Sequence, residues 1–102
     1  MTGPIVPRST FNHGRKSNVG TSVVTLVGDS IKTKRGVLIK AASGNSGKVY
    51  VGISTSVTAD SNDGTDGFEL SAGDSLEVEI NDVRSIHIIA SESGQKVFWI
   101  GV

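Results

Sequence analysis

Short stretches of alternating apolar and polar residues, separated by turn-forming residues, run through the chain from residue 21 onward. In residues 75–80, Leu76, Val78 and Ile80 fall on one face and glutamates on the other, which is typical of an antiparallel strand with one buried and one wet face. Clusters of Gly, Ser, Asn and Asp mark the turns between the stretches. The expected strands cover residues 22–27, 36–41, 48–53, 67–70, 75–80, 84–90 and 96–102.

Short strands at this spacing are typical of an all-β sandwich or small barrel. No window has the periodicity of a helix of useful length. We therefore predict a small antiparallel β-sandwich over residues 21–102. The residues expected to point into its core are Val37, Ile39, Val49, Val51, Leu76, Val78 and Ile80.

Two of the expected strands, residues 22–27 and 96–102, carry apolar side chains on both faces. In the last strand, Val97 and Trp99 fall on one face, and Phe98 and Ile100 fall on the other. Only one face of each sheet joins the internal core in a chain this short, so the other face is left for a partner. We therefore expect a homo-oligomer, with a trimer as the first form to test.

Residues 42–51 resemble residues 90–99, since each stretch has Ala-Ser, four further residues and then a Lys-Val-aromatic run. We interpret both as β-hairpins. The likeness has two explanations: pseudo-symmetry between the halves of a sandwich, or the recurrence of one favourable hairpin sequence, which we prefer.

Residues 1–20 show neither the strand period nor the helix period, and they contain Pro4, Pro7 and several glycines. We expect an extended N-terminal arm over residues 1–20, held in place by another protein chain because it has no core of its own. The arm residues predicted to bind a partner are Ile5, Val6, Arg8, Phe11, Arg15 and Lys16.

The net charge of zero hides an uneven distribution. Residues 1–40 carry seven basic side chains and one acidic side chain, whereas residues 41–102 carry three basic and nine acidic side chains. A basic N-terminal segment is often a nucleic-acid tail, but these cations are dispersed and lack an aromatic-rich basic face, so we expect no nucleic acid as partner. The preferred interpretation is charge complementarity between copies, or with an acidic protein surface.

Several classes of chemistry lack the residues they need. The chain has no cysteine, which excludes disulfides and thiolate chemistry. His13 and His87 belong to no metal-ligand cluster, no serine lies in a Gly-x-Ser-x-Gly turn, and no phosphate-binding loop is present. No apolar run is long enough to span a membrane, and residues 1–8 do not read as a secretory signal. We predict neither an enzyme nor a cofactor-binding protein.

An acidic stretch over residues 60–67 is the sharpest chemical candidate, because carboxylate and amide oxygens in a glycine-bent loop are ligands that Ca²⁺ prefers. Its spacing does not fit the EF-hand pattern. We favour a solvated loop tip rich in turn-forming residues and keep a weak metal site as the alternative. The candidate ligands are Asp60, Asn62, Asp63 and Asp66.

Three stretches carry a resemblance to a known class of proteins. Residues 35–52 read RGVLIKAASGNSGKVYVG, residues 67–76 read GFELSAGDSL with Ile80 following, and residues 97–99 read VFW. These motifs resemble small structural proteins in the virions of tailed bacteriophages. The resemblance covers about residues 21–102 and implies a small jelly-roll-like sandwich present in many copies per particle.

The resemblance and the basic arm together lead us to expect a capsid decoration or cement protein, located in the virion. Its expected partners are the major capsid protein or another virion protein, together with copies of itself. A tail, neck or fibre component is the alternative. A carbohydrate-binding module is the third possibility, and it would need an exposed aromatic platform for which Tyr50 and Trp99 are the plausible members.

Overall fold

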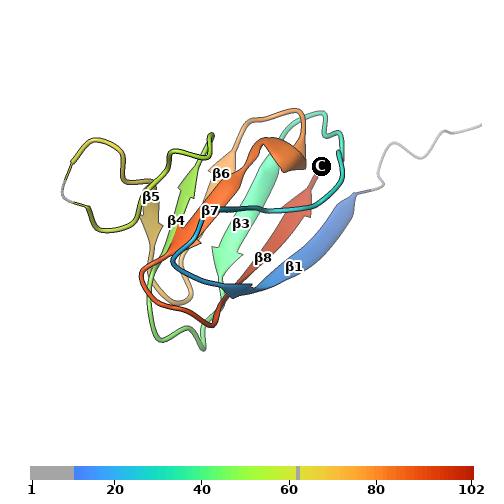
Figure 1. Cartoon of the computed structure of the whole chain (residues 1–102). Coiled ribbons are helices and arrows are strands. Elements are labelled where there is room, and N and C mark those ends of the chain that lie inside the picture. The colour runs from blue at the N-terminus through green and yellow to red at the C-terminus, as the bar shows by residue number, and fades with distance from the viewer. Residues whose placement is uncertain (1–10, 62) are drawn as a thin grey trace, which may run out of the picture.

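The computed structural model describes residues 11–61 and 63–102. They form two four-stranded antiparallel sheets that pack face to face (Figure 1). The fold is therefore all-β, as predicted. The elements are β1 (Asn12–Val19), β2 (Val24–Thr25), β3 (Val37–Ala41), β4 (Val49–Gly52), β5 (Phe68–Leu70), β6 (Ser75–Val78), a single 3-10 turn η1 (Val83–Ser85), β7 (His87–Ala90) and β8 (Gln95–Gly101).

The strand order is β1-β8-β3-β6 in one sheet, here sheet A, and β2-β7-β4-β5 in the other, sheet B. The first strand pairs with the last, β2 with β7, β3 with β6 and β4 with β5, as if one long hairpin had been rolled up. Rolling brings β3 beside β8 and β4 beside β7, which completes each sheet. Two sheets of four strands joined in this order are a jelly roll, which confirms the predicted fold class.

The core lies between the sheets and follows the alternation read from the sequence. Along β3 the side chains alternate strictly between buried and exposed, with Val37 and Ile39 inward. Val49 and Val51 are buried from the facing sheet. The remaining predicted core residues, Leu76, Val78 and Ile80, are partly buried and pack against this cluster. Burial of each such side chain contributes about 1.5–3 kcal/mol, so the core prediction is confirmed.

The arm prediction is wrong for residues 12–19, which form β1, the edge strand of sheet A. Its residues pair with β8 from Asn12 opposite Gly101 to Val19 opposite Gln95. A β-bulge lies between Lys16 and Val19, where Asn18 adopts a left-handed φ of 57°. The bulge shifts the alternation and turns Val19 into the core, where it is fully buried. Ile5, Val6 and Arg8 lie outside the described residues.

Two other strand predictions are too long. Within residues 22–27, only Val24 and Thr25 pair with a neighbouring strand. Residues 83–85 form η1 instead of the start of β7, because the Asp82 side chain accepts a hydrogen bond from the Arg84 amide and caps a short turn. Local side-chain hydrogen bonding thus replaces the ladder that the apolar pattern predicted.

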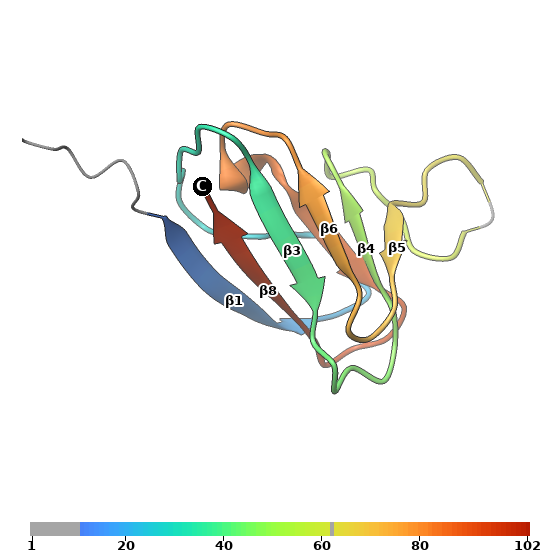
Figure 2. The same cartoon turned by 180° about the vertical axis from the view of Figure 1, so that it is seen from behind.

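The two similar stretches are not hairpins, because β3 and β7 each lead into the opposite sheet. Residues 42–48 and residues 91–94 are connections that cross from one sheet to the other (Figure 2). They lie side by side because β3 pairs with β8 and β4 with β7. The buried Gln95 side chain joins them: its Oε1 accepts from the Gly47 amide at 2.8 Å, and its Nε2 donates to the Ser93 carbonyl at 2.8 Å.

Candidate interaction surface

The described residues contain no group of three or more histidine or acidic side chains that would hold a metal ion. His13 is exposed on β1 in sheet A, while His87 lies on β7 in sheet B with its Nδ1 3.1 Å from the Ser85 carbonyl oxygen. Within residues 11–61 and 63–102, no helix is long and apolar enough to cross a membrane.

The carboxylates of the acidic loop accept hydrogen bonds from the loop itself. Asp63 Oδ1 accepts from the Ser61 hydroxyl at 2.8 Å and from the Thr65 amide at 2.8 Å, and Asp66 Oδ1 accepts from the Ser61 amide at 2.8 Å. The hydrogen bonds from Thr65 and Ser61 lower the pKa of Asp63. Asp60 is exposed with a left-handed φ of 55°, and Asn62 lies outside the described residues. These contacts build the loop, and they are what a turn-rich loop tip requires.

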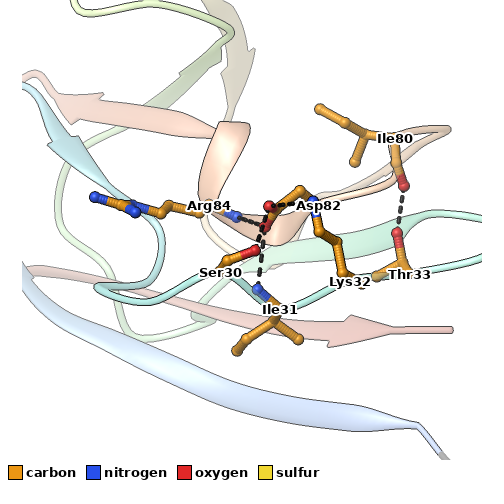
Figure 3. Close-up of polar contacts among 7 residues, drawn as sticks. All are labelled: Ser30, Ile31, Lys32, Thr33, Ile80, Asp82 and Arg84. Carbon is orange, nitrogen blue, oxygen red and sulfur yellow. Dashed lines mark hydrogen bonds and ion pairs between the residues drawn. The ribbon is translucent and has the colours of Figure 1, made fainter.

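A polar cluster around Asp82, missed in the sequence, joins the β2–β3 and β6–β7 connections (Figure 3). Asp82 Oδ1 accepts from the backbone amides of Ile31 at 3.1 Å and Arg84 at 3.0 Å. Its Oδ2 accepts from the Ser30 hydroxyl at 2.5 Å and lies 3.2 Å from Lys32 Nζ. The Ser30 hydrogen bond, followed by that of the Arg84 amide, holds the pKa of Asp82 well below its usual range. The cluster fixes this end of the sandwich.

The two sheets differ in what covers their outer faces. On sheet B, the outward residues Tyr50 and Ile89 are only 4% and 8% exposed, because Val57 and Ala59 from the β4–β5 connection and Val23 pack over them. On sheet A, Leu38 is 41% exposed and Phe98 is 42% exposed. Among the described residues, the β4–β5 connection covers the apolar outer face of sheet B, and no segment covers that of sheet A.

The strand register defines the outer face of sheet A. Leu38 lies opposite Ile100, and Phe98 lies between Arg15 on β1 and Lys40 on β3. The exposed Phe11 precedes β1, and Val102, which is 49% exposed, follows β8. We call this surface the sheet A outer face. Its apolar residues are Phe11, Leu38, Phe98, Ile100 and Val102.

The sheet A outer face carries charges of both signs, and Lys40 lies on β3 opposite Ser75 of β6. Arg15 lies on the β1 edge, while Glu77 on the β6 edge is paired with Leu38. Glu79 follows on the same side and lines a groove with Glu77 and the basic Arg35. The ion pairs within the described part of the chain are Lys32 with Asp82 and Lys48 with Glu69, so these charged groups are not paired there.

The aromatic residues that a carbohydrate platform would need are not exposed. Tyr50 is buried under the β4–β5 connection, and Trp99 is 7% exposed in the core. The Trp99 indole lies over Gly14 of β1, where an added Cβ would come within 2.9 Å of the ring. Both side chains are structural, and the exposed aromatics among the described residues are phenylalanines.

The structure separates the predicted partner-binding residues that it describes. Arg15 lies on the sheet A outer face, and Phe11 is exposed at its margin with its ring centroid 6.3 Å from that of His13. Lys16 instead pairs with the buried Val97, on the inner side of the sheet. Comparisons of the chain with protein-family models, curated proteins and solved structures found no match.

Proposed function

We propose that this protein is a structural subunit of a bacteriophage particle, a capsid decoration protein that acts by binding other protein. The protein-binding role is based on the apolar outer face of sheet A, which the described residues leave exposed, because large exposed apolar patches in soluble proteins mark interaction sites. The assignment to a phage particle is based on the sequence resemblance of residues 35–52, 67–80 and 97–99.

Features of the fold support a binding role. A jelly roll is a rigid scaffold also used in viral capsid domains. The part of the chain before β1 enters the fold at the edge of sheet A, next to the exposed Phe11. Residues 1–10 include Ile5, Val6 and Arg8, and we propose that these three residues contact the major capsid protein. A segment that lies along a neighbouring subunit adds contact area without enlarging the core.

Occupancy on purified, tail-less capsids tests this proposal. We expect removal of residues 1–10, and the Phe11→Ala variant, to reduce occupancy strongly, since burying an aromatic side chain contributes about 1.5–3 kcal/mol. We expect Arg15→Ala to have a smaller effect, because an exposed ion pair contributes about 0–1 kcal/mol. Raising the salt concentration should weaken attachment without eliminating it.

Failure of the full chain to bind capsids would overturn the decoration assignment. Binding to purified tails under the same conditions would instead assign the protein to the tail. Full occupancy by the chain lacking residues 1–10 would show that the sandwich attaches without this segment.

A further inference from the structure

We infer that residues 1–10 of this chain, here the N-terminal segment, dock into the groove on the sheet A outer face of their own subunit while it is free. They leave the groove when they bind the capsid protein. This second step rests on the proposed function, because it makes the groove and the capsid alternative partners of one segment. The first step, docking in the free subunit, holds whatever particle the protein joins.

The groove exists because Gly36 interrupts the row of side chains at one end of sheet A. The Gly36 amide donates to the Val102 carbonyl of β8 at 3.2 Å, and the Gly36 carbonyl accepts from the Val102 amide at 3.0 Å. On the other side of Gly36 lies β6, where an added Cβ would collide with the backbone of Val78 and Glu79. No larger residue fits at this position, so the floor of the groove is bare backbone.

One wall of the groove is apolar and exposed. It is formed by Leu38, Ile100 and Val102. The other side carries charges of both signs, from Arg35, Glu77 and Glu79. Charge therefore does not select what binds here, and the apolar wall favours apolar side chains that exclude water from it. The groove has a volume of about 750 Å³, which is in the range of clefts that bind small ligands.

The N-terminal segment joins the fold next to this groove. Asn12 pairs with Gly101, which places Phe11 beside Val102 at the end of sheet A where β1 and β3 begin and β8 ends (Figure 2). From β1 to β3 is two strand spacings, or about 10 Å, whereas ten extended residues span about 33 Å. The segment is therefore long enough to turn back before Phe11 and to lay residues 4–7 in the groove.

The composition of the segment suits an apolar groove. Its apolar run is Pro4-Ile5-Val6-Pro7. Each proline fixes its own φ and biases the residue before it toward an extended conformation. Such a segment loses little conformational entropy when it docks, which favours binding. We assign Ile5 and Val6 to the apolar wall, against Leu38 and Ile100.

The covalent connection decides between the subunit's own groove and that of a second copy. A short connection gives an effective concentration on the order of millimolar, which exceeds the micromolar concentrations used in solution. The segment therefore occupies its own groove until a capsid surface competes for it, and we expect the predicted homo-oligomer to form on the particle, where the groove is free. Because a terminal segment opens before the sandwich unfolds, its docking leaves the melting temperature unchanged.

A disulfide tests the docking directly, because the chain has no cysteine of its own. In the Ile5→Cys/Leu38→Cys variant, we expect oxidised glutathione to join the two residues within one chain. Ile5→Cys/Phe68→Cys is the matched control, since Phe68 is exposed on β5 of sheet B. It should form on the order of tenfold less internal disulfide, because its two thiols have a lower effective concentration. Non-reducing electrophoresis and peptide mass spectrometry measure both.

Nuclear magnetic resonance spectra give a test without cysteines. Removing residues 1–10 should shift the amide signals around the groove and leave those of sheet B unchanged. Val6→Ser, which lies five residues before Phe11, should reproduce these shifts because it removes an apolar contact. Thr2→Ser lies outside the apolar run and should not shift them.

The oxidised Ile5→Cys/Leu38→Cys chain also tests the link to the proposed function. With the segment held in the groove, we expect poor occupancy on purified capsids, and reduction of the same sample should restore it. Equal occupancy before and after reduction would overturn the exchange and leave the proposed function. If the disulfide forms but neither the reduced nor the unmodified chain binds capsids, the docking stands and the proposed function fails.

Two results would overturn the docking itself. One is an internal disulfide no more abundant than in the Ile5→Cys/Phe68→Cys control, and the other is a set of groove signals that Val6→Ser leaves unchanged. Disulfides that join two chains would show that the segment occupies the groove of a second copy, which would also overturn the inference.

Discussion

Two polar side chains, Asp82 and Gln95, hold the two ends of this sandwich together. The Asp82 carboxylate accepts from the Ile31 amide in the β2–β3 connection and from the Arg84 amide in its own β6–β7 connection. The Gln95 side chain accepts from the Gly47 amide in the β3–β4 connection and donates to the Ser93 carbonyl in the β7–β8 connection. Loops that cross between sheets have no ladder to satisfy their backbone groups, so side chains take over that role. At the scale of single residues, we therefore expect replacement of either side chain to lower the stability of the fold.

We expect Asp82→Asn to lower stability at neutral pH and to flatten its acid dependence. The pKa of Asp82 is lower in the folded protein than in the unfolded chain, so its contribution is fully present above the unfolded value of about 3.9 and is lost as the pH falls below it. Urea midpoints from pH 7 to pH 2 measure this. Asp29→Asn, at an exposed position in the β2–β3 connection that Asp82 contacts, is the control. Equal acid sensitivity in the wild type and Asp82→Asn would contradict the assignment.

We expect Gln95→Leu to destabilise the fold by about 1–3 kcal/mol, because it leaves the Gly47 amide and the Ser93 carbonyl without their partner in a buried place. Chemical denaturation measures the change in the free energy of unfolding. Ser43→Ala changes an exposed residue in one of the same connections and should have little effect. An unchanged free energy of unfolding in Gln95→Leu would contradict this prediction, because it would mean that water satisfies the two backbone groups equally well.

At the scale of elements, β1 depends on backbone pairing with β8 and on one buried apolar residue, Val19. Its outward and edge positions are polar, and Arg15, Lys16 and the bulge at Asn18 make the edge a poor template for unwanted strand pairing. The strand is nevertheless part of the fold, because Val19 is buried and Gly14 accommodates Trp99.

Two truncations separate the segment before β1 from β1 itself. Removing residues 1–10 takes away none of the described strands, and we expect an unchanged melting temperature. Removing residues 1–20 deletes β1 and the buried Val19, uncovers one edge of β8 and exposes Trp99, so we expect a large drop in melting temperature or loss of folding. Thermal unfolding followed by tryptophan fluorescence compares them. Equal melting temperatures of the two truncated chains would instead support an arm over residues 1–20 that is separable from the sandwich.

At the scale of the whole molecule, the jelly roll makes strands that are distant in the sequence into neighbours. The first strand pairs with the last, and β8 lies between β1 and β3 in the centre of sheet A. Sheet A therefore cannot be completed until nearly the whole chain is available. Of the seven connections between these strands, all but β4–β5 cross from one sheet to the other. Those that follow β1, β3, β5 and β7 lie together at one end of the sandwich, and those that follow β2 and β6 lie at the other end (Figure 2).

We expect slow refolding, in the range of milliseconds to seconds, because folds dominated by long-range strand pairing close large loops before they gain contacts. Stopped-flow fluorescence of the buried Trp99 reports the rate. A chain that stops at residue 94 lacks β8 and should not fold, as circular dichroism would show. Microsecond refolding, or a folded truncated chain, would contradict this picture.

The sequence by itself determined the all-β class and the facing of most strands. The alternation in β3 and β6 predicted which side chains point inward, since a side-chain period of two relates residue type directly to face. The same rule, applied to the apolar residues on both sides of β8, predicted that sheet A would carry apolar residues on its outer face.

Only the tertiary structure decided which strands pair and what covers each outer face. β1 is nearly invisible in the sequence because an edge strand held by backbone hydrogen bonds needs little apolar alternation. The similar stretches at residues 42–51 and 90–99 carry turn signals, but a local signal does not specify whether the next strand joins the same sheet. Tyr50 and Phe98 are both outward aromatics, and one is buried and the other exposed because the β4–β5 connection packs over sheet B alone. Such cover depends on contacts between distant residues, which no local pattern encodes.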